Sequence, residues 1–470
     1  MTTPVRSLLI RLQIFLVLFA LPPCVIWGAS VTPSEARTSA DRPNIIFILA
    51  DDLGYGDLGC YGSRFIRTPH IDRLEAEGTR FTHAYAGSPV CAPSRGVLMT
   101  GLHTGHARIR DNMPRVGGLI EPYAGGREKG IRLSLGAEDL TIAQVLSEAG
   151  YATGITGKWG LGEEGSAGVP GKKGFGEFLG YLNQNHAAYY YTDYLDTHDG
   201  RRAIPQNSGG QNAVYSNDLF SDFAVEFVRR HRNRSFFLYL PFTIPHNRME
   251  VPNLGAYAAE DWPSDAKIYA AMVSRLDEYV GRLLAELDRL DLAGKTVLFL
   301  TSDNGVLGGN RAKLLGSAAG LRGFKGSLYE GGLRVPMIVR WPGQVPSGRV
   351  STEPWMFVDF FPTALELAGL TLRTRLDGSS VVGLLTGRPR TGTEERTFYW
   401  EYPQKRLQQA VRRGKWKALR SGTDQPLELY DLSRDEAESR DVSRENPQVV
   451  AEFERFLAGA RVPSPHWPVE

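Results

Sequence analysis

Cysteine is scarce in this 470-residue chain, which contains only Cys24, Cys60 and Cys91. Cys24 lies in an N-terminal segment that we expect to be removed, so an exported form could hold at most one internal disulfide, between Cys60 and Cys91. Taken alone, Cys91 could be half of that bridge or a small buried hydrophobic residue. A scaffold held together by several disulfides is therefore excluded.

Net charge is also nearly absent. The chain has 54 Lys and Arg against 52 Asp and Glu, a formal net charge of +2. This balance gives no long-range attraction to nucleic acid or to an anionic membrane surface, so we expect no nucleic-acid partner. Beyond the N-terminus no apolar run reaches the roughly 20 residues that a membrane-spanning helix needs, and we expect no stable membrane insertion.

The N-terminus has the features of a signal peptide. Arg6 and Arg11 precede an apolar run over residues 14–27, and small residues follow it. A membrane anchor is the competing interpretation, but the run is short for a bilayer and contains two prolines. We therefore predict that residues 1–30 form a signal peptide and that the protein is exported, either periplasmic or secreted.

Apolar, strand-like stretches alternate with helical patterns along most of the remaining chain. The run Ile45–Ala50 is continuous, as in a strand buried on both faces of a parallel sheet. Further strands are predicted at 79–86, 151–156, 235–242, 296–301 and 335–341. Helices are predicted at 68–78, 140–150, 263–290 and 357–369. This alternation predicts an α/β fold in which helices sandwich a large, mainly parallel sheet.

Turn signals mark a change of organisation after residue 372, where Gly, Thr and Arg are frequent up to residue 396. We predict a catalytic domain over 42–372, preceded by a linker over 31–41. The remainder, 373–470, is predicted to be a small C-terminal α+β domain with one sheet and a final helix.

Two of the predicted strands end in oxygen-bearing side chains: Asp51 and Asp52 follow one, and Asp303 and Asn304 follow the other. Active groups of open α/β sheets collect at such carboxyl ends. One acidic pair could simply start a turn, but two equivalent pairs favour a shared cation, because adjacent carboxylates repel each other without one. Hard oxygen ligands favour Ca²⁺, or Mg²⁺, over Zn²⁺ or copper.

Four cationic or imidazole residues lie in comparable loops: Arg95, Lys158, His246 and Lys325. Any one of them could be an ordinary solvated loop residue. Beside a metal site, however, they would form a pocket for a tetrahedral anion that is being transferred.

Six motifs occur in order from about Arg42 onward: ADDLGYGD, CAPSRGVLMTG, GKWGLG, IPH, SDNG and KGSLYEGGLRVP. With them the chain resembles the type I sulfatases, the formylglycine-dependent branch of the alkaline phosphatase superfamily. LELYDL and the acidic segment after it resemble the end of the family's C-terminal domain. The resemblance implies an alkaline phosphatase-like fold and hydrolysis of an organic sulfate ester, either an aryl sulfate or a sulfated carbohydrate.

The resemblance also implies a modified cysteine. In this family the cysteine of C-x-P-x-R is oxidised to formylglycine, so Cys91 would be the substrate of a formylglycine-generating enzyme and would form no disulfide. The hydrated aldehyde carries two hydroxyls, one to attack sulfur and one to collapse and expel sulfate. Cys60 would remain a lone, buried thiol.

Further roles follow from the same resemblance. The cation would be held by Asp51, Asp52, Cys91, Asp303 and Asn304. Arg95 would hold the hydrated formylglycine, and Lys158 and Lys325 would neutralise sulfate oxygens. His246 would lie near the leaving oxygen, which it or Lys325 could protonate.

One position departs from the family pattern. Many members have G-K-W-H-L-G, with a histidine that contacts the formylglycine hydroxyl, where this chain has Gly160. His186 is our candidate for the missing base, and a surface-loop histidine is an equally good interpretation. The neighbouring Tyr189, Tyr190 and Tyr191 could stack on a sugar or simply pack.

Two other functions stay open. Phosphonate monoester and phosphodiester hydrolases of the same superfamily also use C-x-P-x-R, although the loops GKWGLG and EGGLRVP favour a sulfatase. A non-catalytic glycan-binding homologue is the third possibility, with Gly160 as its first sign of decay.

Overall fold

The computed structural model describes residues 31–33, 42–113, 119–123, 127–388, 395–404 and 406–469. The predicted signal peptide lies outside this part of the chain. Within it, no helix combines the length and apolar character needed to cross a membrane.

An eleven-stranded sheet forms the centre of the molecule, in the order β13-β3-β12-β11-β2-β10-β6-β7-β8-β9 with β14 beside β3. Its strands are β2 (Asn44–Ala50), β3 (Thr79–Tyr85), β6 (Ala152–Lys158), β7 (Glu177–Tyr181), β8 (Tyr194–Thr197), β9 (Gly200–Ala203), β10 (Phe236–Pro241), β11 (Thr296–Ser302), β12 (Arg334–Arg340), β13 (Arg349–Ser351) and β14 (Trp355–Met356). The pairs joining β11, β2, β10, β6 and β7 are parallel. The predicted large, mainly parallel sheet is confirmed.

Antiparallel pairs flank this parallel centre, which the sequence pattern did not predict. β12 runs antiparallel to both β11 and β3, and β8 runs antiparallel to β7 and β9. Strand length and apolar character do not reveal strand direction, so the alternation pattern could only indicate the predominant type.

Strand β2 shows why the sheet is covered on both sides. Every residue of it is buried. Ile45, Phe47 and Leu49 belong to one hydrophobic cluster, whereas Ile46, Ile48 and Ala50 belong to another. Successive side chains of a strand point to opposite faces, so each cluster lies on one face of the sheet.

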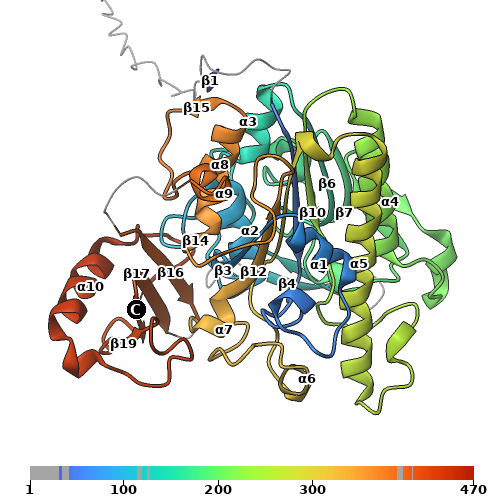
Figure 1. The fold of residues 1–470 in the computed structure, drawn as a ribbon. Helices are drawn as coiled ribbons and strands as arrows, with labels where there is room; N and C mark the ends of the chain where they lie inside the picture. Colours follow the sequence, from blue (N-terminus) through green and yellow to red (C-terminus); the bar gives the residue numbers. More distant parts are fainter. Residues whose placement is uncertain are drawn as a thin grey trace, which may run out of the picture.

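Two groups of helices supply these clusters, as Figure 1 shows. One face carries α1 (Pro69–Ala76), α4 (Ser216–His231) and α5 (Ser264–Arg289). The other carries α2 (Cys91–Thr100), α3 (Ile142–Glu148) and α8 (Phe360–Leu367). Short helices α6 (Asn310–Leu314), α7 (Glu330–Leu333) and α9 (Val382–Leu385) lie in the connections.

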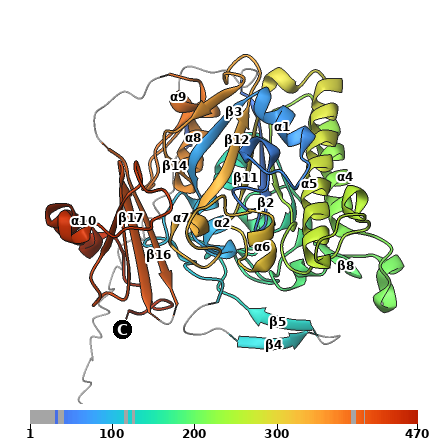
Figure 2. The same ribbon diagram turned by 60° about the horizontal axis from the view of Figure 1, so that its bottom comes forward.

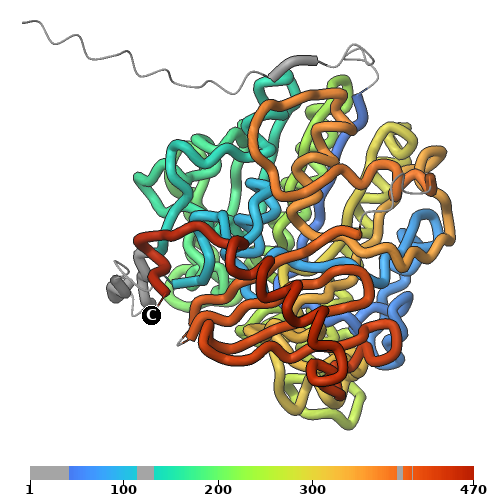
Figure 3. Tube along the Cα trace, turned by 90° about the vertical axis from the view of Figure 1, so that its left-hand side faces the viewer, coloured from blue at the N-terminus to red at the C-terminus, as the bar shows by residue number. Residues whose placement is uncertain are grey.

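The C-terminal part is a four-stranded antiparallel sheet packed by one helix (Figure 3). It contains β16 (Thr397–Pro403), β17 (Leu407–Arg413), β18 (Trp416–Ser421), β19 (Glu428–Asp431) and α10 (Pro447–Gly459). Phe453 and Leu457 of α10 pack into its core. The small α+β unit is as predicted, although β16 was not.

Two small strand pairs complete the fold. β1 (Val31–Pro33), inside the segment predicted to be a linker, pairs with β15 (Leu370–Leu372). β4 (Leu119–Tyr123) and β5 (Arg127–Ile131) form an antiparallel pair that projects from the body of the molecule (Figure 2). The boundary placed after residue 372 stays a prediction.

Candidate active site

The site begins where β2 and β11 end side by side. Their parallel register pairs Ala50 with Ser302, so the acidic residues that follow both strands emerge at the same level. The Asp52 backbone N–H donates to Asp303 Oδ1 at 3.2 Å, and the Asp303 N–H donates to the Ala50 carbonyl at 3.0 Å. The predicted meeting of the two oxygen-bearing pairs above the sheet is therefore present.

Asp52 adopts an unusual backbone conformation, with φ of 67°. A non-glycine residue in this left-handed region costs roughly 1–2 kcal/mol. Its neighbours hold it there: Asn304 Nδ2 donates to Asp52 Oδ1 at 2.7 Å, and Tyr269 donates its hydroxyl to the Asp52 carbonyl at 3.3 Å. Such strain tends to occur where a side chain must point in one direction for function.

Cys91 is the first residue of α2 and is buried against the same group. Its Sγ lies 3.4 Å from Asp51 Oδ1 and 4.0 Å from Asp52 Oδ1. Burial, together with the charge of Asp303, raises the pKa of the Cys91 thiol to about 12 although two lysines oppose the rise. A neutral, buried thiol is a poor nucleophile.

Both Cys60 and Cys91 are free. The disulfide that the cysteine count left open is thus wrong. The expectation that Cys60 is buried is also corrected, because it is only partly covered, in a turn where its backbone N–H donates to Asp72 Oδ1 at 2.8 Å.

Arg95 lies one helical turn after Cys91, so both side chains share a face of α2. Its Nε and Nη2 donate to Asp303 Oδ2 at 3.1 and 2.8 Å, and its Nη1 donates to the Lys158 carbonyl at 2.6 Å. The guanidinium therefore ties α2 to the ends of β6 and β11.

Two lysines bring positive charge to the carboxylates. Lys158, the last residue of β6, donates from Nζ to Asp51 Oδ2 at 2.7 Å. Lys325 Nζ lies 2.6 and 2.8 Å from the two carboxylate oxygens of Asp52 and 3.2 Å from Cys91 Sγ. The predicted sulfate-pocket lysines thus flank Cys91.

The protonation equilibria of the three aspartates differ. Burial alone would raise the pKa of Asp51, but Lys158, His246 and Arg95 hold it well below its usual range. Asp52 also has a lowered pKa, because Lys325 outweighs its burial. Burial and the charge of Asp51 instead raise the pKa of Asp303 to about 6. The cationic side chains therefore stabilise the ionised forms of Asp51 and Asp52 more than that of Asp303.

His246 completes the group on its more open side, with 22% of its side chain exposed. Its Nε2 lies 3.6 Å from Asp52 Oδ2. Burial lowers the pKa of the imidazole even though Asp51 and Asp52 oppose the change, which favours the neutral ring. Tyr190 donates its hydroxyl to the His246 carbonyl and holds the backbone in place.

The oxygen atoms of Asp51, Asp52 and Asn304 are the kind of donor that a hard cation prefers. Ligand atoms within 4.8 Å of one another come from Asp51, Asp52, Cys91 and His246. Asn304 Oδ1 is buried without a hydrogen-bond donor among the described residues, and such an orphaned oxygen is expensive unless something binds it. The geometry adds His246 to the predicted ligands. Both Asp303 oxygens accept hydrogen bonds, as do oxygens of Asp51 and Asp52, so Asp303 as a ligand stays a prediction.

The structure does not bring His186 into this group. His186 is buried, its Nε2 lies 2.7 Å from Thr192 Oγ1, and its ring packs on Tyr181 and Tyr194. None of these three contacts involves Cys91 or an aspartate of the site. His186 as a substitute base stays a prediction without geometric support.

The structure also explains why position 160 has no side chain. Its φ is 73°, and a β-carbon added there would lie 2.9 Å from Gln184 Cγ. Gln184 Nε2 in turn lies 3.4 Å from Asn112 Oδ1, which accepts the backbone N–H of Ala92 at 2.9 Å. The space for a side chain at position 160 is therefore filled by Gln184. No sequence signal singled out Gln184 or Asn112, because both approach Cys91 only through folding.

Residues 43–370 match the family described as Sulfatase, and residues 324–461 match the C-terminal region of N-sulphoglucosamine sulphohydrolase. The chain belongs to the sulfatase family. This sulfatase is a sulfuric ester hydrolase, and its fold agrees with the one that the motifs implied.

Relatives of the sulfatase cover most of its length. Human arylsulfatase A is 33% identical over 449 residues, covering 85% of this chain and 83% of the relative. N-acetylgalactosamine-6-O-sulfatase of Bacteroides thetaiotaomicron is 28% identical, covering 90% and 94%. The crystal structure of Ps i-CgsB superposes with a TM-score of 0.74 at 30% identity, covering 89% and 92%, and that protein is also known in complex with a neocarrahexaose.

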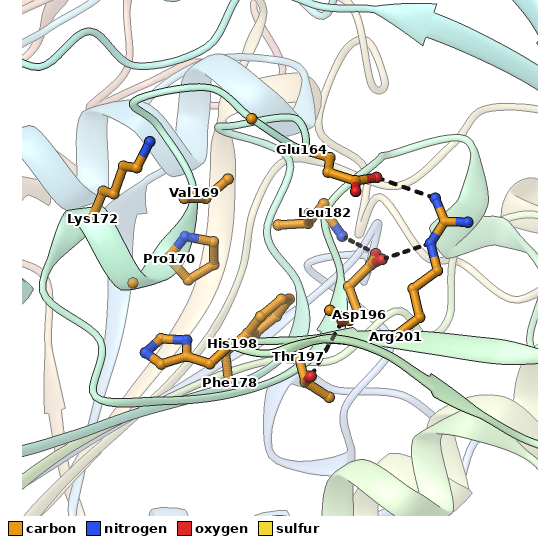
Figure 4. A pocket seen from close by; sticks show the side chains of 13 residues that line it. Glu164, Val169, Pro170, Lys172, Phe178, Leu182, Asp196, Thr197, His198 and Arg201 are labelled. Carbon is orange, nitrogen blue, oxygen red and sulfur yellow. Dashed lines mark hydrogen bonds and ion pairs between the residues drawn. The ribbon is translucent and has the colours of Figure 1, made fainter.

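A separate cavity of about 570 Å³ lies beside β7 and β8 of the sulfatase (Figure 4). Val169, Pro170, Phe178 and Leu182 form apolar walls, and Arg201 bonds to acidic side chains at one end. None of the predicted site residues lines this cavity, so it is distinct from the group around Cys91.

Proposed function

We propose that this sulfatase is exported and hydrolyses the sulfate ester of a carbohydrate, with aryl sulfates as further substrates, through a formylglycine at position 91 and a bound Ca²⁺. The observation that supports it best is the convergence of Asp51, Asp52 and Lys325 on Cys91 Sγ, all within 4.0 Å. A buried thiol with a raised pKa would be inactive there, whereas an oxidised side chain would face an electrostatic pocket suited to it.

The formylglycine and the divalent cation would supply the nucleophile and the Lewis acid. A formylglycine hydrate would offer one hydroxyl for attack on sulfur and a second whose deprotonation releases sulfate. A divalent cation held by Asp51, Asp52, Asn304 and neighbouring groups would polarise the ester and the attacking hydroxyl.

The side chains of the protein itself would neutralise the charge of the sulfate and hold the site in place. Lys158 and Lys325 supply positive charge where the transferred sulfate gains negative charge, an interaction strengthened by burial. Arg95 holds Asp303 and the end of β6 in place. His246, which is partly exposed, or Lys325 would protonate the leaving oxygen. Lys325 carries a proton to transfer because Asp52 raises its pKa well above the usual range despite its burial, but the same rise makes it a weaker acid.

The carbohydrate class is favoured by the relatives. N-acetylgalactosamine-6-O-sulfatase and Ps i-CgsB, the latter seen with a neocarrahexaose, span nearly the whole of this chain. Arylsulfatase A supports aryl sulfates as test substrates.

The proposal is tested by producing the protein with a formylglycine-generating enzyme. Mass spectrometry of the peptide containing residue 91 should show the aldehyde or its hydrate. Turnover of an aryl sulfate should exceed turnover of the matched aryl phosphate diester. A preference for the phosphodiester would support the phosphonate and phosphodiester hydrolase alternative, and sugar binding without turnover by fully modified protein would support a non-catalytic homologue.

A further inference from the structure

An arginine outside the predicted site is connected to the residue after Cys91. Asn112 Oδ1 accepts the Ala92 backbone N–H at 2.9 Å, and the Asn112 carbonyl accepts from Arg132 Nη1 at 2.6 Å. A single asparagine thus separates the Arg132 guanidinium from the backbone beside Cys91. Nothing in the motif pattern indicated this approach.

The hydrogen bonding of Arg132 is incomplete. Its Nη2 donates to Asn185 Oδ1 at 2.7 Å. Its Nε is inaccessible to solvent and has no hydrogen-bond partner among the described residues. A buried donor of a cation that is left unpaired is costly, so the fold holds this guanidinium in place at a cost in free energy. The residue is only partly buried, and Nη1 and Nη2 each carry a second N–H, so an anion would bind on the Nη side.

The positive charge of Arg132 is also not neutralised by an ion pair within the described part of the chain. Glu163 and Asp111 act on Arg132 without forming an ion pair with it, and each accepts a hydrogen bond from another group: Glu163 Oε1 from Asn183 Nδ2 at 3.0 Å, and Asp111 Oδ1 from the Asn112 N–H at 2.6 Å. Burial lowers the pKa of Arg132, with Glu163, Cys91 and Asp111 opposing the change, which places Cys91 within electrostatic range.

We infer that Arg132 binds a second anionic group of the substrate, a sulfate or a carboxylate, while the sulfate ester to be cleaved lies over Cys91. The inference rests on the proposed function and narrows the substrate class to sugars with two acidic groups close together. A guanidinium offers a planar pair of donors that matches the oxygens of either group. Gln184 and Asn112 add uncharged amides between the two anion positions and would not repel them.

A purely structural role is the competing explanation, because Arg132 and Asn112 lie at the two ends of the excursion that contains β4 and β5. If Arg132 is purely structural, replacing it should weaken the binding of all substrates alike. If Arg132 binds a second anion, replacing it should weaken the binding only of ligands that carry one.

The experiment measures competition against aryl sulfate turnover by N-acetylgalactosamine 6-sulfate, N-acetylgalactosamine 4,6-disulfate and a 6-sulfated uronate disaccharide. These probes carry one sulfate, two sulfates, and one sulfate with one carboxylate. For the wild type, we expect one or both dianionic probes to compete roughly 10- to 100-fold better than the monosulfate, the scale of one charge-assisted hydrogen bond.

Arg132→Gln should remove this preference and leave aryl sulfate turnover within about threefold, and Arg132→Lys should retain part of it. Arg108→Gln is the matched control, since Arg108 already pairs with Glu138 at 2.9 Å, and should keep the preference. The preferred dianion identifies sulfate or carboxylate as the second group.

Equal competition by all three probes in the wild type would overturn the inference. So would a parallel loss for every probe and for aryl sulfate in Arg132→Lys, which would assign Arg132 to structure. If the wild type fails to turn over aryl sulfate, the proposed function fails, and calorimetry of the same probes on Cys91→Ala protein still decides whether Arg132 selects dianions.

Discussion

Two of the buried charge clusters in the described part of the chain differ in what surrounds them. One is the group around Cys91. The other joins the catalytic part to the C-terminal sheet, where Lys417 Nζ lies 2.9 Å from both Glu330 and Glu438. Tyr85 donates its hydroxyl to Glu330 at 2.8 Å, and Arg412 donates to Tyr85.

The cluster of Glu330, Lys417 and Glu438, here called the interface cluster, has no access to solvent. Glu330, Lys417 and Glu438 are all fully buried. Burial alone would raise the pKa of Glu330, but Lys417 and Arg412 lower it to about 2. In the Cys91 cluster, Asn304 Oδ1 lacks a described donor, and Lys325 and His246, by contrast, remain partly exposed. Glu438 Oε1 of the interface cluster likewise has no hydrogen-bond donor among the described residues, although Lys417 Nζ lies 2.9 Å away. The two clusters therefore differ in access to solvent, which only the Cys91 cluster has, through Lys325 and His246.

The two clusters are also linked. Glu330 begins α7, five residues after Lys325, and Arg322 on the other side of that lysine donates to the Glu438 carbonyl at 2.7 Å and to the Tyr430 hydroxyl at 3.0 Å. The C-terminal sheet thus holds both ends of the loop that carries Lys325.

The largest expected effect is on Cys91. Cys91→Ala should lower aryl sulfate turnover by at least about 10³-fold, because no other described group replaces the nucleophile. The melting temperature should change little by comparison. Cys60→Ala is the matched control and should retain turnover. Full activity of Cys91→Ala would refute the assignment of the nucleophile.

The next largest effect is on cation binding, which should depend on residues of the Cys91 cluster and not on residues of the interface cluster. Asp52→Asn and Asn304→Ala should each weaken Ca²⁺ binding by more than the roughly 10- to 100-fold typical of outer-shell changes, and activity should fall with it. Glu438→Gln should leave the metal content unchanged. Elemental analysis after chelation gives the occupancy, and full activity of metal-free protein would rule out the cation.

Lys417→Met should destabilise the fold by about 3–5 kcal/mol, because Glu330 and Glu438 then stay buried without the ammonium group that both carboxylates share. The double change Glu330→Gln with Lys417→Met should cost less than the sum of the two single changes. Denaturant unfolding measures these values. Since the same region supports the Lys325 loop, kcat should also fall in the single variant; an unchanged stability would show that the cluster is not coupled to folding.

A smaller effect concerns acid stability where the two parts meet. His103 packs on Tyr399, and burial lowers its pKa to about 4 although Asp377 opposes the change. The unfolded chain, with an ordinary histidine pKa near 6.5, binds the proton more readily. Stability should therefore fall as the pH drops from about 6.5 to 4, by roughly 2 kcal/mol. Unfolding curves of His103→Gln should show a weaker dependence across this window.

The smallest effect on catalysis is expected for His186→Ala. Because the ring is bonded to Thr192 and packed among tyrosines, turnover per folded molecule should stay within about threefold of the wild type, far from the 10² to 10⁴ of a general base. Rapid-mixing kinetics with an aryl sulfate should show no burst. A burst equal to the number of active sites would instead restore His186 as the base that releases sulfate.

The fold class and the meeting of the acidic residues at the strand ends could be predicted from the sequence alone. Continuous apolar runs such as Ile45–Ala50 specify buried strands, and the residues just after such strands must emerge at one edge of a parallel sheet, so Asp51 and Asp303 could be paired without coordinates. The motif C-x-P-x-R led to the prediction that Cys91 is converted to formylglycine. These inferences depend on neighbours in the chain, which a sequence records directly.

Only the tertiary structure decided which distant side chains fill, support or extend that site. Gln184 occupies the space beside Gly160, His186 turns toward Thr192, and Arg132 approaches Cys91 through Asn112. Each contact joins segments whose separation in space is set by packing of the whole sheet, and no local periodicity encodes it. The same holds for Lys417 and Glu330, where charge is buried only because two separate sheets meet.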